Sequence, residues 1–118
     1  MRFFIMSESY HAAQLPLFPS PELEAYLAGV IKGDGWCTGY SIGLRVADRD
    51  FAEAFAAAIT QVFNVPLRIG QERQRYWIVR TSNKTGKYTY LLSLEPTTTS
   101  EKAFWLRGLF DSEGNAQL

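Results

Sequence analysis

The sequence predicts a mixed α+β domain, on three observations. Two segments 79 residues apart share a helical motif, short stretches alternate apolar and polar residues as strands do, and an alanine-rich stretch carries large apolar residues every fourth position. The chain has 118 residues, of which 47% are hydrophobic and 20% are charged. This is globular composition with enough length for a core.

Cysteine and histidine usage excludes two kinds of stabilising site. Cys37 and His11 are the only residues of their types, so the chain has neither an internal disulfide nor enough ligands for a structural zinc ion. His11 falls in a polar N-terminal lead, residues 1–19, where we expect it to be solvated. The opening residues 1–6 are too short for a signal-peptide core, and no apolar run reaches membrane-spanning length. We therefore expect a soluble protein with no membrane partner.

An internal repeat organises the chain. Residues 27–35 read LAGVIKGDG and residues 106–114 read LRGLFDSEG. The aligned pairs are Leu27 with Leu106, Gly29 with Gly108, Val30 with Leu109, Ile31 with Phe110, Asp34 with Glu113, and Gly35 with Gly114. The spacing is too long for a solenoid, so the repeat indicates two half-domains related by a pseudo-two-fold axis.

Each copy carries the signals of a helix. Ser20 and Pro21 supply a cap and a first-turn residue for the first copy. Thr98 and Glu101 have capping-box spacing before the second. Both copies end in glycine, the usual helix stop.

Small residues recur at four-residue spacing in both helices: Gly29 and Gly33 in the first, Gly108 and Ser112 in the second. Residues at this spacing share a helix face, and a face of small residues allows two backbones to approach closely. Such packing would bring Asp34 and Glu113 side by side. Two carboxylates there repel each other and need a compensating charge, and Mg²⁺ suits oxygen ligands of this kind.

The segment between the motifs supplies the strands and a further helix. One strand begins at Trp36, and residues 41–46 point Ile42, Leu44 and Val46 to one side. Residues 51–63 form an amphipathic helix capped by Asp48 or Asp50. Residues 65–70 are a second alternating strand, which Pro66 makes an edge or strand start.

Residues 74–82 form a third strand whose facing stays open, because Trp77 with Val79 and Tyr76 with Ile78 compete for the core. Asn83 starts another helix, which carries Tyr88, Leu91 and Leu92 and contains Gly86 as an unfavourable interior residue.

The paired motif resembles that of the LAGLIDADG homing endonucleases, over nearly the whole chain from about Ser20. The resemblance implies an α-β-β-α-β-β-α half-domain with an antiparallel DNA-binding sheet. Residues 1–19 would be the lead, 20–97 the first domain, and 98–118 the second motif helix with the start of an incomplete second domain. Lys32 stands where the family motif has aspartate, a variable position away from the metal. Asp34 and Glu113 would be catalytic and hold Mg²⁺, or Mn²⁺ or Ca²⁺ in its place.

Charge distribution adds a candidate DNA surface. Between Arg68 and Lys87 lie six basic residues and one acid, although the whole chain has a net charge of zero. We expect these residues to contact DNA: Arg45, Arg68, Arg73, Arg75, Arg80 and Lys87. The resemblance also implies a basic residue near the scissile phosphate, and Lys84 fits that place best, with Lys87 second.

The predicted function is that of an intron-encoded, site-specific endonuclease that cuts double-stranded DNA at a long target. It would work in a prokaryotic cytoplasm or an organelle. The chain stops at Leu118, a few residues into the second half. We therefore expect an incomplete form of a longer enzyme, shortened naturally or deliberately. Alone it would cut weakly, and the missing half makes a homodimer or domain-swapped assembly plausible.

Two other functions compete with this interpretation. One is a non-cleaving nucleic-acid-binding protein of the same fold, an intron maturase or a regulator, although a pure binder has no need of two repelling carboxylates. The other is a small α+β interaction module in which the repeat is coincidental. Intein origin is disfavoured because no splice-junction residues bracket the domain.

Overall fold

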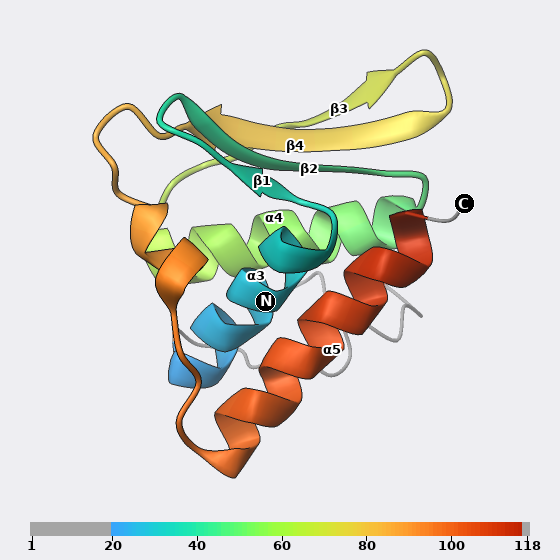
Figure 1. The fold of residues 1–118 in the computed structure, drawn as a ribbon. Helices are drawn as coiled ribbons and strands as arrows, with labels where there is room; N and C mark the ends of the chain where they lie inside the picture. The colour runs from blue at the N-terminus through green and yellow to red at the C-terminus, as the bar shows by residue number, and fades with distance from the viewer. Residues whose placement is uncertain (1–19, 117–118) are drawn as a thin grey trace.

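The structure is a computed structural model that describes residues 20–116, with side chains through Glu113 (Figure 1). The N-terminal lead with His11, and residues 117–118, lie outside the described residues. The elements follow in the order α3 (Pro21–Gly33), β1 (Trp36–Cys37), β2 (Ser41–Val46), α4 (Arg49–Phe63), β3 (Ile69–Glu72), β4 (Tyr76–Ser82), the 3-10 helix η1 (Thr89–Ser93) and α5 (Thr99–Ala116).

Helix α3 forms as its capping residues predict. The Ser20 hydroxyl accepts a hydrogen bond from the backbone N–H of Leu23 at 3.1 Å, and Pro21 occupies the first turn. Eight of its 13 residues are buried, including the fully enclosed side chains of Tyr26 and Leu27. It ends at Gly33 with Asp34 as the C-cap, so the first motif acid is the residue that leaves the helix.

The four strands form one antiparallel sheet in the order β1-β2-β4-β3. The predicted facing of β2 is confirmed, because Ile42, Leu44 and Val46 are buried in the core. The open question in β4 is settled in favour of Trp77 and Val79. Both pack on the core side, where Val79 pairs with Leu44. Tyr76, Ile78 and Arg80 therefore share the opposite face, which we call the outer face.

Helix α4 covers the inner face of the sheet. Asp48 is its N-cap and accepts hydrogen bonds from the backbone N–H groups of Asp50 and Phe51, which decides between the two predicted caps. Phe51, Phe55 and Ile59 are fully buried at the four-residue spacing that predicted the helix.

The strand predicted over residues 65–70 is only partly correct, since β3 begins at Ile69 and runs on to Glu72. Helix α4 is followed by Asn64 in the left-handed conformation, and Pro66 has no N–H to donate to a ladder. Residues 65 and 67 still pack against the core as the alternation indicated. Three residues then connect β3 to β4. Arg73 and Gln74 have φ of 54° and 59°, and the N–H of Arg75 donates to the carbonyl of Glu72 at 3.1 Å, as in a type I′ turn.

The helix predicted from Asn83 is only partly correct, because the helical residues are those of the short 3-10 helix η1, with Tyr88 as its N-cap. Asn83 is instead a buried junction. Its Nδ2 donates to the carbonyl of Thr38 at 2.7 Å and to Thr89 Oγ1 at 3.1 Å, and its Oδ1 accepts from the N–H of Tyr88 at 3.0 Å. These bonds hold a loop in which Gly86 has a φ of +74°, so regular helix is limited to η1.

Helix α5 begins at the predicted cap. Thr98 Oγ1 accepts from the N–H of Glu101, while the Glu101 carboxylate reaches one residue further back than expected, to the N–H of Thr97 at 2.9 Å. These hydrogen bonds lower the pKa of Glu101, that from Thr97 most strongly. The predicted stop at Gly114 is wrong, because the helix continues to Ala116. Glu113 thus lies inside its last turn.

The predicted α+β class is confirmed: three α-helices and a four-stranded antiparallel sheet make up the described residues. Figure 1 shows all three helices on one side of the sheet, so no described element covers the outer face. No helix in residues 20–116 has the length and apolar character needed to cross a membrane.

Candidate functional site

The two motif helices meet backbone to backbone, with glycine at each point of closest approach. A Cβ added at Gly29 would overlap the carbonyl oxygen of Trp105 and lie 2.9 Å from the N atom of Leu109. A Cβ at Gly108 would overlap the carbonyl oxygen of Tyr26 and lie 3.0 Å from the N atom of Val30. These residues are the aligned partners of the repeat. The contact is therefore reciprocal, as a two-fold relation between the helices requires.

The same relation extends to the second pair of small residues. A Cβ at Gly33 would lie 2.9 Å from the carbonyl oxygen of Leu109, and Ser112 Oγ donates to the carbonyl oxygen of Val30 at 3.0 Å. Residues in contact differ in number by about the repeat spacing, so the helices run parallel and in register. All four small residues lie in this contact. Asp34 and Glu113 each follow it by one residue, at the same end of the helix pair.

Asp34 is a partly buried carboxylate. Its N–H closes α3 by donating to the carbonyl of Val30 at 3.0 Å, and the side chain emerges where the chain turns toward β1. Burial raises the pKa of Asp34, and the positive charge of Arg45 opposes that rise. A cation near this carboxylate would favour its ionised form.

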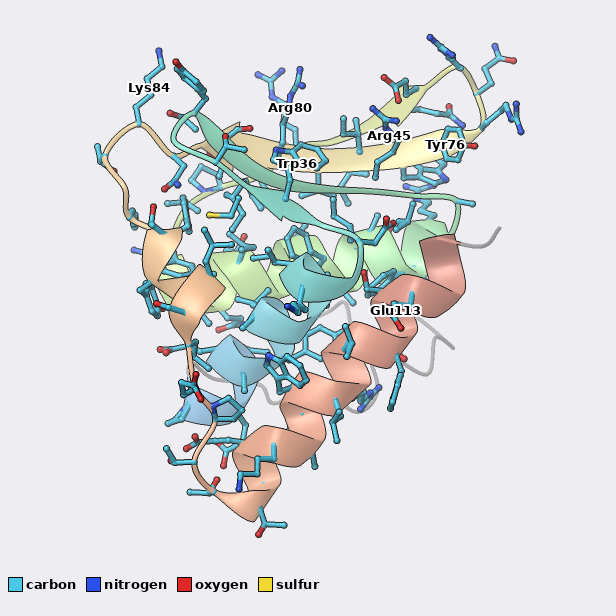
Figure 2. All side chains as sticks on the ribbon, in the orientation of Figure 1. Trp36, Arg45, Tyr76, Arg80, Lys84 and Glu113 are labelled. Atoms are coloured by element: carbon cyan, nitrogen blue, oxygen red, sulfur yellow. The ribbon has the colours of Figure 1, made fainter. Side chains whose placement is uncertain are left out.

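Glu113 is exposed on the last turn of α5, as Figure 2 shows. The two acids thus differ in environment although they occupy equivalent motif positions. Among the described residues no cluster of three or more histidine, cysteine or acidic side chains could hold a metal ion. Two carboxylates fit Mg²⁺ in ligand type, because Mg²⁺ commonly takes one or two carboxylates and completes its shell with water and phosphate oxygens.

Arg45 is the basic residue next to Asp34. It lies on β2, two residues beyond Gly43, which pairs with Trp36 of β1, and its charge acts on the Asp34 carboxylate. Arg45 lies on the outer face, where its Nε contacts Glu72 Oε1 of β3 at 2.9 Å. Both partners are substantially exposed, so this ion pair contributes little to stability. It orients the guanidinium over the sheet, where an incoming phosphate could displace the carboxylate.

The remaining predicted arginines are all exposed. Arg80 pairs with Gly43 across β2 and β4 and stands on the outer face (Figure 2). Arg73 is in the hairpin turn, and Arg75 follows it with its guanidinium 5.5 Å from the Tyr76 ring. Arg68 precedes β3. Arginine is therefore presented along the outer face and at the β3–β4 turn.

The two predicted lysines are not brought to the motif acids. Lys84 follows β4 and lies just beyond Ser82, which pairs with Ser41. Ser41 and Arg45 are four residues apart, or roughly 14 Å along a strand, so Lys84 and Asp34 are near different ends of β2. Lys87 Nζ donates to the carbonyl of Phe63 at 3.3 Å, which ties it to the C-terminus of α4.

A pocket between α3, η1 and α5 is lined by neither of the motif acids, Asp34 and Glu113. Ala28, Ile31, Leu91 and Trp105 contribute much of its apolar lining, with Lys32 among the polar residues. The two acids proposed from the motifs therefore lie outside this pocket.

No family model and no curated protein matches the chain. Function therefore has to be argued from the geometry. Two aromatic residues that the sequence analysis missed are Trp36, which covers Gly43 on the outer face, and Tyr40 in the β1–β2 turn, which is 79% exposed. The turn residues Thr38 and Gly39 were the available signal. A hairpin this short sets Trp36 opposite Gly43, where the absence of a side chain leaves room for the indole.

Proposed function

We propose that the chain is a LAGLIDADG-type endonuclease half-domain with a second motif helix, which hydrolyses DNA phosphodiesters with a divalent metal ion held between Asp34 and Glu113. The observation that carries the proposal is the reciprocal contact of the two motif helices through Gly29 and Gly108. A chance repeat has no reason to pack on itself in register. The parallel arrangement gives both copies an acid at the same end.

The charge of the outer face supports DNA as the substrate. Arg45 and Arg80 project from neighbouring strands of an antiparallel sheet that no described helix covers. A twisted antiparallel ribbon can enter the major groove, where arginine reads guanine or contacts phosphate. In this proposal the sheet binds half of a long target.

Arg45 is the residue best situated to stabilise charge at the phosphate, because its electrostatic influence reaches Asp34. Its guanidinium would bind a phosphate oxygen while Asp34 and Glu113 hold the cation. A bound divalent cation supplies activation of water and neutralisation of charge on the phosphate. Lys84 would instead contact the DNA backbone away from the reacting phosphate.

The decisive experiment is cleavage of an insertion-site library with Mg²⁺, comparing the chain with its Asp34→Asn/Glu113→Gln double variant. Glu95→Gln, which alters an exposed acid in the loop before α5, is the matched control. We expect nicking by the wild type and by the control, and at least a hundredfold loss in the double variant. Equal cleavage by all three would refute the assignment of the acids.

Metal binding gives a readout that does not depend on activity. Titration with Mn²⁺, followed by electron paramagnetic resonance, should show weaker binding in the double variant than in the wild type or Glu95→Gln. The single variants Arg45→Gln and Lys84→Gln then separate the two basic residues. We expect the first to reduce the cleavage rate much more than DNA affinity, and the second to reduce affinity.

A non-cleaving nucleic-acid-binding protein of the same fold is the second candidate. The unequal environments of the two acids favour it, because Glu113 is exposed while Asp34 is partly buried. Binding of a DNA target without metal-dependent cleavage, equal in the wild type and the double variant, would establish this function instead.

A further inference from the structure

Aromatic and basic side chains gather at one end of the outer face. Trp36 lies on β1, Tyr40 in the β1–β2 turn, Arg80 on β4, and Lys84 in the loop that follows. We call these four residues the aromatic–basic end. In Figure 2, Lys84 lies on the loop beyond one end of the sheet, Trp36 and Arg80 stand nearer its middle, and Arg45 and Tyr76 lie toward the other end.

The Trp36 ring lies over Gly43 and is held there by a hydrogen bond. A Cβ added at Gly43 would overlap the Cζ2 atom of the indole and lie 2.8 Å from its Cη2 atom, so the six-membered ring rests on the glycine. The indole Nε1 donates to Ser41 Oγ at 2.8 Å, which sets the rotation of the ring. Backbone of β2 therefore covers one part of the indole, and Trp36 is partly exposed on the face of the sheet that no described helix covers.

The same hydrogen bond limits what Trp36 can recognise. An indole has a single polar group, its N–H, and Ser41 already occupies it. The ring therefore cannot read the hydrogen-bonding edge of a base pair. What it offers is the exposed part of its aromatic ring, which suits stacking.

The other members of the aromatic–basic end complete a binding surface. The Tyr40 side chain is 79% exposed, although its backbone is held by Thr38 Oγ1, 3.0 Å from its N–H, and by the N–H of Asn83, 2.8 Å from its carbonyl. Arg80 sits beside Gly43 in the strand register. Neither Arg80 nor Lys84 forms an ion pair with a described residue, in contrast to Arg45.

We propose that the aromatic–basic end binds unpaired nucleotides. A base stacks on the exposed part of the Trp36 ring, a neighbouring base reaches Tyr40, and Arg80 and Lys84 contact the phosphates. Single-stranded nucleic acid is bound by this combination of aromatic platforms and basic side chains. In a duplex the faces of the bases are hidden by their neighbours, so an aromatic ring on a sheet has nothing to stack on. The inference rests on the proposed function only in that the outer face meets nucleic acid.

The test measures affinity of the whole chain for ten-residue oligothymidine and oligouridine, and for a duplex, by fluorescence anisotropy. Trp36→Ala should weaken single-strand binding about five- to hundredfold, which is the loss expected for one stacked base. Tyr76→Ala is the matched control, because it removes an aromatic ring from the other end of the same face. It should change affinity less than twofold.

Ser41→Ala keeps the indole but removes the hydrogen bond that orients it, so it tests the platform even if Trp36→Ala folds poorly. We expect circular dichroism like that of the wild type and an intermediate loss of single-strand affinity. Equal affinity for the two oligomers would mean that the sugar is not read. Preference for oligouridine would identify RNA as the source of the unpaired nucleotides, and both results support the proposal.

Two other outcomes separate this inference from the proposed function. Duplex cleavage by a wild-type chain that binds neither oligomer would overturn the inference and leave the nuclease intact. Equal losses of duplex and single-strand affinity in Trp36→Ala would also overturn it, since the ring would then contact both kinds of nucleic acid alike. Tight single-strand binding without duplex cleavage would support the inference while the nuclease assignment fails.

Discussion

Helices α3 and α5 carry the same motif but lie in different surroundings. Leu27 and its counterpart Leu106 are 0% and 42% exposed, and Ile31 and its counterpart Phe110 are 5% and 63% exposed. Gly29 and Gly108, in contrast, are both buried in the helix contact. The small residues of the motif thus determine how the helices meet each other. Burial of the large residues in α3 depends on η1, α4 and the sheet, which pack against that helix.

The largest effect should come from the helix contact. Gly29→Ala would push a methyl group into the Trp105 carbonyl, and overpacking against rigid backbone should cost about 3 kcal/mol or more of unfolding free energy. Helix propensity alone predicts the opposite sign, since alanine is favoured over glycine by about 1 kcal/mol. Gly108→Ala should lower the unfolding free energy by a similar amount, because its methyl group would meet the Tyr26 carbonyl. Gly39→Ala, where a Cβ meets nothing within 4 Å, is the control in urea unfolding.

A stability equal to that of Gly39→Ala in either helix variant would mean that the helices do not touch through glycine in solution. Loss in one variant only would mean that the reciprocal relation between the two copies is broken.

The next effect compares the large residues of the motif. Leu27→Ala should destabilise the chain by about 2–5 kcal/mol, as expected for a fully buried leucine. Leu106→Ala should cost less than about 0.5 kcal/mol because its side chain is substantially exposed. Both are measured by urea unfolding at a low and a high protein concentration. A large cost for Leu106→Ala, growing with concentration, would show that a second molecule covers α5.

A smaller effect concerns the hydrogen bond that joins the helices. Ser112→Ala removes the donor to the Val30 carbonyl and should cost about 1 kcal/mol. Ser93→Ala, on an exposed position of η1, is the matched control and should be nearly neutral. A neutral Ser112→Ala would indicate that water replaces the hydroxyl without loss.

The smallest effect is the pH dependence contributed by Asp34. Because burial raises its folded-state pKa, the folded chain binds the proton more tightly than the unfolded chain. Stability from this group is therefore present below pH 3.8 and is lost as pH rises through the folded-state pKa. The unfolding free energy of Asp34→Asn should match the wild type at low pH and exceed it near neutrality. A wild type that gains on the variant as pH rises would reverse the assigned shift.

Local signals in the sequence were enough for the elements that positioned the site. Three signals depend only on residues close together in the sequence. They are the cap at Ser20, the alternation of β2 and the four-residue spacing in α4. Facing of β4 could not be predicted, because apolar side chains stand on both of its faces and only pairing with β2 assigns Val79 to the core.

Errors arose where distant contacts override local preference. Asn83 bonds to Thr38, 45 residues away, and this connection holds a loop where spacing alone favoured a helix. The helix contact of the site was foreseen because the repeat aligned its small residues. The separation of Lys84 from Asp34 was not foreseen, because it follows from the strand register. The position of the Trp36 ring over Gly43 was missed for the same reason.

The reciprocal glycine contact also constrains how the chain can fold during synthesis. Gly29 and Gly108 must meet, yet 79 residues separate them. A ribosome adding about 5–20 residues per second needs roughly 4–16 s to cover that interval. Throughout it the contact face of α3 has no partner, and the contact that requires the most distant parts of the chain forms last. For those seconds, a nascent chain with an exposed glycine face is open to pairing with the wrong helix, including that of a neighbouring copy.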